Sequence, residues 1–117
     1  MSKIEILNIT PAAFEAMYRD NGLLPTTGHG GIVNGCCCAL GVLAVHLKGV
    51  NKDQCSDYQV VSFLMNDRGI KRATSFGIGF DSGFKNYKEN QSIDFNDEYV
   101  HGHKVGVYIR KAFSNKP

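Results

Sequence analysis

Three of the four cysteines in this chain stand side by side at positions 36, 37 and 38, where a strongly apolar segment begins. Adjacent thiols serve either as small packing residues in a core or as a reactive or metal-binding site, because free cysteine is both a small hydrophobe and a nucleophile. Three neighbouring thiols are hazardous in an oxidising compartment, since they cannot all pair without scrambling. The N-terminal segment carries Glu5 within its only apolar stretch, which is unlike a secretory signal. We therefore expect a cytoplasmic protein with reduced cysteines.

The overall composition is that of a globular protein. A chain of 117 residues has room for one core, so we expect a single globular domain over residues 1–117. No segment approaches the roughly 20 apolar residues of a membrane span, so we expect no membrane association. Thirteen Lys and Arg residues are interspersed with eleven Asp and Glu residues. A nucleic-acid partner is not expected, because such proteins usually present a clustered basic face.

Capping residues and apolar spacing predict about five helices. Apolar residues surround the second of these helices, which is typical of a central, buried helix. Residues 3–9 alternate loosely and fit one short strand or an extended arm. The predicted fold class is mainly all-α, a compact bundle of about five helices to which residues 3–9 can add one short N-terminal strand. The first predicted helix begins at Thr10-Pro11 and ends before Gly22, and the second spans 36–48. The third begins at Ser56-Asp57, the fourth spans 71–86 and the fifth spans 96–113.

The last segment fits either a helix or a strand. His103, Val105, Val107 and Ile109 alternate with other residues, as in a strand. Acidic residues lead the segment and basic residues end it, an order that complements the dipole of a helix. We favour the helix.

Two pairs of glycines have helical spacing. Gly79 and Gly83 are four residues apart, as are Gly102 and Gly106, and each pair lies beside an aromatic stripe. A glycine inside a helix costs about 1 kcal/mol relative to alanine. The paired spacing predicts that the fourth and fifth helices cross with their backbones in close contact, by analogy with small-residue motifs in membranes.

A thiol enzyme is the sharpest catalytic hypothesis. Cys36 would begin the second helix after Asn34 and Gly35, where the helix dipole lowers the pKa of a thiol. Papain-like peptidases place a nucleophile at such a point and a histidine at the start of a later strand, and His103 would fill that second role. Cys36 and His103 would then carry out acyl transfer. The only candidate for a third, orienting group is Asn115.

The sequence predicts no bound metal and no cofactor. The two histidines at 101 and 103 point about 160° apart on a helix and cannot chelate one ion. The cysteine spacing matches no zinc signature. The segment Gly77–Gly83 has one residue too many for a dinucleotide-binding turn and does not follow a buried strand.

Three segments carry a resemblance to a known group. They are residues 37–41 (Cys-Cys-Ala-Leu-Gly), 76–83 (Phe-Gly-Ile-Gly-Phe-Asp-Ser-Gly) and 99–106 (Tyr-Val-His-Gly-His-Lys-Val-Gly). In this order the chain resembles small uncharacterised bacterial and phage proteins with C-A-[IL]-G-A, G-F-x-x-G-[FW]-D-G and Y-x-x-G-x-x-x-G-like segments. It departs from them at Val42 and Ser82. The resemblance implies a helical domain in which the cysteines and glycines are architectural.

These patterns favour a small non-enzymatic interaction module that binds a protein partner or a second copy of itself. The segment 22–35 is the longest irregular stretch. It contains four glycines and one proline, and it ends at a further glycine, Gly35. Long loops in small domains often carry binding. We therefore expect the contact in this loop, with His29 and Ile32 exposed.

Overall fold

Caps and glycine stops divide the chain into short helices, as the sequence predicts. The computed structural model describes residues 5–28, 31–85 and 96–114, and 62% of these residues are helical and 7% are in strand or bridge pairing. The fold is mainly all-α with one short two-stranded sheet, which confirms the predicted class. The helices are α1 (Pro11–Asn21), α2 (Ala39–His46), α3 (Asp57–Ser62), α4 (Ala73–Phe84) and α5 (Asp97–Ala112). Two shorter segments are the 3₁₀ turn η1 (Ile6–Asn8) and the π-helical segment η2 (Phe63–Asp67), which continues from α3.

Three helices begin at the caps that the sequence predicts or implies. The Thr10 side chain accepts a hydrogen bond from the Ala13 amide before Pro11 begins α1, and Gly22 ends α1 with φ 66°. Ser56 and Gln59 form a reciprocal capping box at α3. Helix α5 starts after Asn96, and its acidic first turn and basic last turn confirm the preference for helix over strand.

The start of the second helix was predicted wrongly. Cys36 and Cys37 form strand β2, which pairs in parallel with β1 (Leu24–Pro25), and α2 begins only at Ala39. The reason is a tight turn at Asn34 and Gly35, whose φ values of 55° and 76° are left-handed. Such an Asn-Gly pair reverses the chain and leaves extended backbone after it. Regular structure therefore occurs inside the 22–35 segment, where the sequence predicted none.

Two other boundaries differ from the predictions. Residues Ile6–Asn8 form a short 3₁₀ turn instead of a strand, because the amides of Asn8 and Ile9 bond back to Glu5 and Ile6. Helix α2 ends at His46 instead of residue 48, since the chain turns left-handed at Lys48 (φ 61°).

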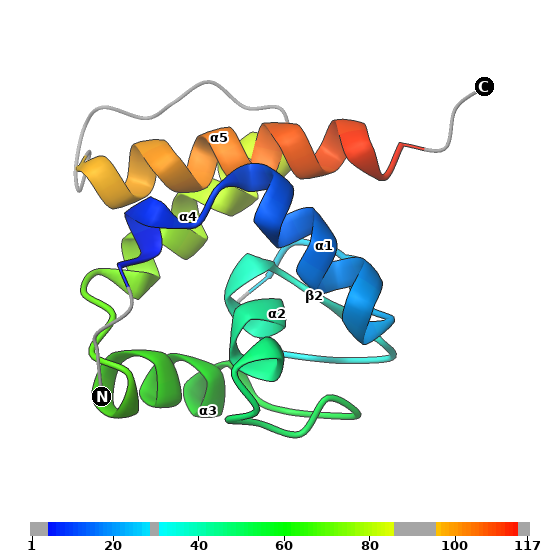
Figure 1. Cartoon of the computed structure of the whole chain (residues 1–117), viewed down its shortest axis with the longest axis vertical. Helices are drawn as coiled ribbons and strands as arrows, with labels where there is room; N and C mark the ends of the chain where they lie inside the picture. The colour runs from blue at the N-terminus through cyan, green and yellow to red at the C-terminus, as the bar shows by residue number, and fades with distance from the viewer. Residues whose placement is uncertain (1–4, 29–30, 86–95, 115–117) are drawn as a thin grey trace.

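The predicted glycine crossing is confirmed. A Cβ on Gly79 or Gly83 would overlap the carbonyl oxygen of Tyr99 or His103, and a Cβ on Gly102 or Gly106 would overlap a carbonyl oxygen of α4. The backbones of α4 and α5 are therefore in direct contact, and in Figure 1 α5 lies across α4 on one side of the molecule. Helix α2 lies below this pair and beside α3 (Figure 1).

The core surrounds α2, whose residues Ala39 to Val45 are all buried, as predicted for a central helix. Phe14 of α1 stacks on Phe76 of α4, with ring centroids 5.4 Å apart. The buried Tyr18 hydroxyl donates to the Cys37 carbonyl oxygen at 2.9 Å. These contacts hold α1, β2 and α4 around α2, and residues of α3 and α4 line a pocket over the buried Leu40 near the start of α2.

Candidate functional site

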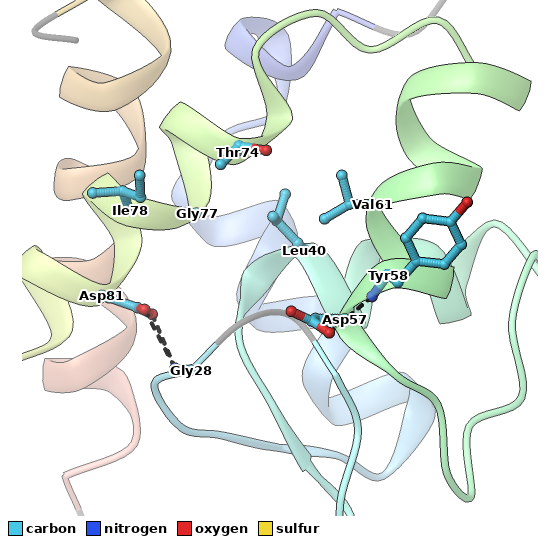
Figure 2. A pocket seen from close by; sticks show the side chains of 9 residues that line it. All are labelled: Gly28, Leu40, Asp57, Tyr58, Val61, Thr74, Gly77, Ile78 and Asp81. Atoms are coloured by element: carbon cyan, nitrogen blue, oxygen red, sulfur yellow. Dashed lines mark hydrogen bonds between the residues drawn. The ribbon is translucent and has the colours of Figure 1, made fainter.

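An apolar pocket of about 320 Å³ opens between α3 and α4. Figure 2 labels the nine residues that line it, which come from the loop after β1, from α2, from α3 and from α4. We call this pocket the α3–α4 groove. Its volume lies at the lower end of the range of about 300–1,000 Å³ that ligand pockets usually span.

The floor of the groove is apolar and is formed by a helix that is otherwise buried. Leu40 of α2 is 3% exposed, and in Figure 2 its side chain and that of Val61 point toward the same space. Gly77 brings bare backbone to the floor, and a Cβ at this position would lie 2.8 Å from Leu40 Cδ1. The missing side chain at Gly77 therefore keeps the groove open above Leu40.

The rim combines exposed apolar side chains with carboxylates. Tyr58 is 78% exposed and Ile78 is 51% exposed, so two large apolar side chains border the same hollow. Asp57 and Asp81 stand on the same rim, and the Gly28 amide lies 3.3 Å from Asp81 Oδ2 in a hydrogen bond that joins the loop to α4 (Figure 2). The rim is therefore negatively charged next to an apolar floor.

A second, more polar pocket of about 430 Å³ adjoins the groove. Gly28 and Asp57 line both pockets, so the two share a border. The second pocket is lined by the hydroxyl residues Thr26, Thr27 and Ser56, by the exposed Val33 and by the thiol residues Cys36 and Cys55. It therefore combines hydroxyl groups with apolar surface.

The structure removes the local features on which the thiol-enzyme hypothesis depended. Cys36 lies in a strand and not at a helix N-terminus, and its Sγ lies 3.7 Å from the carbonyl oxygen of Asn34. His103 lies within α5 and not in a strand, and it lines neither of the two pockets. His103 Nδ1 is buried and has no hydrogen-bond partner among the described residues. Asn115 lies outside the described residues.

The N-cap residue of α2 is Cys38 and not Cys36, and both Cys37 and Cys38 are buried. Cys37 and Cys38 are 0% and 1% exposed. Burial raises the pKa of Cys38 to about 11 and raises the pKa of Cys37 further still. A buried thiol with a raised pKa is a poor nucleophile. These two cysteines are packing residues of the core, in agreement with an architectural role.

The predicted contact residues of the loop have different outcomes. Ile32 was expected to be exposed, but it is completely buried, because its backbone pairs with Cys55 in an antiparallel bridge that carries the side chain into the core. His29 lies outside the described residues. The loop nevertheless reaches both pockets through Gly28.

The described residues contain no group of three or more His, Cys, Asp or Glu side chains that could hold a metal ion. His101 is engaged elsewhere, since its Nε2 lies 2.7 Å from the Ile9 carbonyl oxygen. Among the helices of the described segments, none is both long and apolar enough to cross a membrane.

Comparison with protein-family models, with curated proteins and with solved structures gives no match to this chain. The similarity to small bacterial and phage proteins therefore stays a prediction, and the site must be judged on its geometry.

The sequence analysis missed the residues that form the groove. It assigned no role to Thr74 and Asp81 of α4, both of which line the groove. Two signals were available. Ile78 is a large apolar residue outside the aromatic stripe of its helix, and Tyr58 stands in the first turn of α3 on a side that the core does not use.

Proposed function

We propose that this chain is a small, cytoplasmic, non-enzymatic interaction module that binds a protein partner through the α3–α4 groove. The observation that carries the proposal is the coincidence of a concave apolar floor at Leu40 and Gly77 with the strongly exposed side chains of Tyr58 and Ile78. Exposed large apolar side chains that gather around a hollow mark interaction sites, whereas single scattered ones do not.

The composition of the rim supports a protein partner. Tyrosine is enriched among the residues that dominate binding energy, and such residues cluster around pockets that an anchor of the partner fills. Tyr58 also lines a further pocket beside α3. A partner that covers the exposed Tyr58 ring would bury apolar surface there.

The loop 22–35 remains part of the proposed contact, but the centre of the contact is the α3–α4 groove. Gly28 contributes backbone to both pockets, while the side chain of Ile32 is buried and cannot meet a partner. A second copy of the chain is the other candidate occupant. Sedimentation of the pure chain over a range of concentrations distinguishes it from a different protein.

Site-specific photo-crosslinking in cells tests the proposal. A photoreactive amino acid at position 78 should give a discrete crosslinked protein, while the same group at position 24 should not. Leu24 is a matched control, because it is 57% exposed and lines neither pocket. Equal crosslinking from the two positions would refute the assignment of the groove.

A further inference from the structure

We infer that the occupant of the groove is a short extended segment of the partner protein that carries a bulky aliphatic residue beside a lysine or arginine. This inference rests on the proposed function and adds the chemistry of the partner. Three features of the two adjoining pockets carry it, namely an apolar floor, a rim of one charge, and a shared border.

The floor calls for an aliphatic side chain. Leu40 and Val61 present branched aliphatic groups, and Gly77 presents backbone without a side chain. Among the described residues that line the groove there is no lysine or arginine, and the polar side chains are those of Thr74, Tyr58 and the two carboxylates. An aliphatic anchor therefore fits the floor better than a polar one, since a polar side chain would lose its hydration there without replacement hydrogen bonds.

The carboxylate on the rim favours a positively charged group on the partner. Asp57 and Asp81 both line the groove in a chain whose net charge is +2. The negative rim is therefore a local feature and not a consequence of overall composition. Since the Asp81 carboxylate already accepts from the Gly28 amide, Asp57 is the carboxylate assigned to the ligand. Asp57 is exposed at the first position of α3, and its Oδ1 accepts a hydrogen bond from the Tyr58 amide at 2.9 Å. In Figure 2 its carboxylate faces the groove. Complementary charge at a rim contributes specificity more than affinity.

The shared border calls for an extended segment. Asp57 and Gly28 line both pockets, so a charge held at Asp57 lies where the two pockets meet. The hydroxyls of Thr26 and Thr27 can bond the backbone of a segment that continues past the basic residue, whereas the Ser56 hydroxyl is already engaged with Gln59 in the capping box of α3. A compact ligand would fill only one of the two pockets, whereas an extended peptide spans both.

Peptide selection on the full chain tests this chemistry. Random peptides of about twelve residues, displayed on phage, are selected against the folded protein, and the selected sequences are synthesised and titrated. We expect an aliphatic residue beside lysine or arginine in the selected sequences. Replacing the aliphatic residue by alanine should weaken binding about tenfold or more. Replacing the basic residue by glutamine should weaken it up to roughly fivefold at low salt.

A double-mutant cycle assigns the charge. In Asp57→Asn protein, exchange of the peptide's basic residue for glutamine should no longer matter. In Asp53→Asn protein it should matter as much as before, because Asp53 is an exposed carboxylate that lines neither pocket. Melting temperatures of both variants confirm that each is folded.

The outcomes separate this inference from the function on which it rests. Selected peptides that are weakened by Ile78→Asp but lack a basic residue overturn only the inference. The same holds if the basic residue matters equally with and without Asp57. Peptides that bind regardless of Ile78→Asp refute the groove as the site. If no peptide is selected, both the proposed function and the inference fail.

Discussion

Gly79 of α4 brings its bare backbone against the carbonyl oxygen of Tyr99 in α5, at a position where any side chain would overlap that oxygen. Three further glycines on the two helices make the same kind of contact. The crossing therefore depends on the absence of side chains at four positions. It also sets where α4 lies relative to α2 and α3, and so where one wall of the groove stands.

Gly79→Ala should destabilise the protein strongly. Alanine has the better helix propensity, but its methyl group would push apart two backbones that cannot yield. We expect a loss of about 3 kcal/mol in the free energy of unfolding and a fall of more than about 10 °C in melting temperature. Gly77→Ala in the same helix is the control, because its methyl group meets only the end of the Leu40 side chain. Equal melting temperatures for the two variants would contradict the account of the crossing.

Tyr18→Phe should lower the free energy of unfolding by about 1 kcal/mol, as measured by urea denaturation. The variant loses a buried hydrogen bond to the Cys37 carbonyl oxygen, but that oxygen keeps the Thr26 amide as a donor at 3.0 Å. Tyr108→Phe is the matched control, since the Tyr108 hydroxyl bonds Glu15 at the surface. The prediction is wrong if the two variants have the same midpoint.

The native protein should protect Cys37 and Cys38 from alkylation until denaturant is added. Both thiols are buried, and burial raises the pKa of each, so little thiolate forms near neutral pH. Intact-mass measurement over time, with mapping of the modified residue, checks this. Modification of Cys36 much faster than a free thiol would instead favour the thiol-enzyme hypothesis, and Cys36→Ser would then have to abolish any activity found.

Stability should fall as the pH rises through the range where unfolded thiols ionise. The unfolded thiol loses its proton near a pKa of 9.0, whereas Cys38 holds its proton in the folded state up to about 11. Between these values the unfolded state binds fewer protons, so the free energy of unfolding decreases with pH. The slope is about 1.4 kcal/mol per pH unit for each buried thiol. Cys38→Ala should therefore show a smaller loss than wild type between about pH 9 and pH 10. Identical slopes would mean that Cys38 ionises alike in both states.

Local signals predicted the helices well because their causes are local. Thr10, Pro11 and Gly22 bound α1 through their own side-chain and backbone preferences, and the capping box at Ser56 does the same for α3. The glycine crossing was also predictable, because residues four apart in the sequence lie on the same face of a helix. The Asn34–Gly35 turn was an available signal that apolar periodicity outweighed, and this is why Cys36 was placed on the wrong element.

The groove could not be predicted in this way. It lies between α3 and α4, and the separation of these two helices depends on tertiary packing that no local sequence pattern indicates. Its floor is Leu40, which sequence analysis correctly treats as a core residue. Only the packing of α2 beneath the two walls makes part of that core residue accessible to a ligand.

The most direct test of the account measures the affinity of the crosslinked partner, once purified, for two variants of the full chain. Ile78→Asp should weaken binding at least about tenfold, because it places a charge where the partner buries apolar surface. Leu24→Asp should leave the affinity unchanged, although Leu24 is equally apolar and slightly more exposed. Melting temperatures should show both variants folded. If Ile78→Asp binds the partner as tightly as wild type, the α3–α4 groove is not the interaction site.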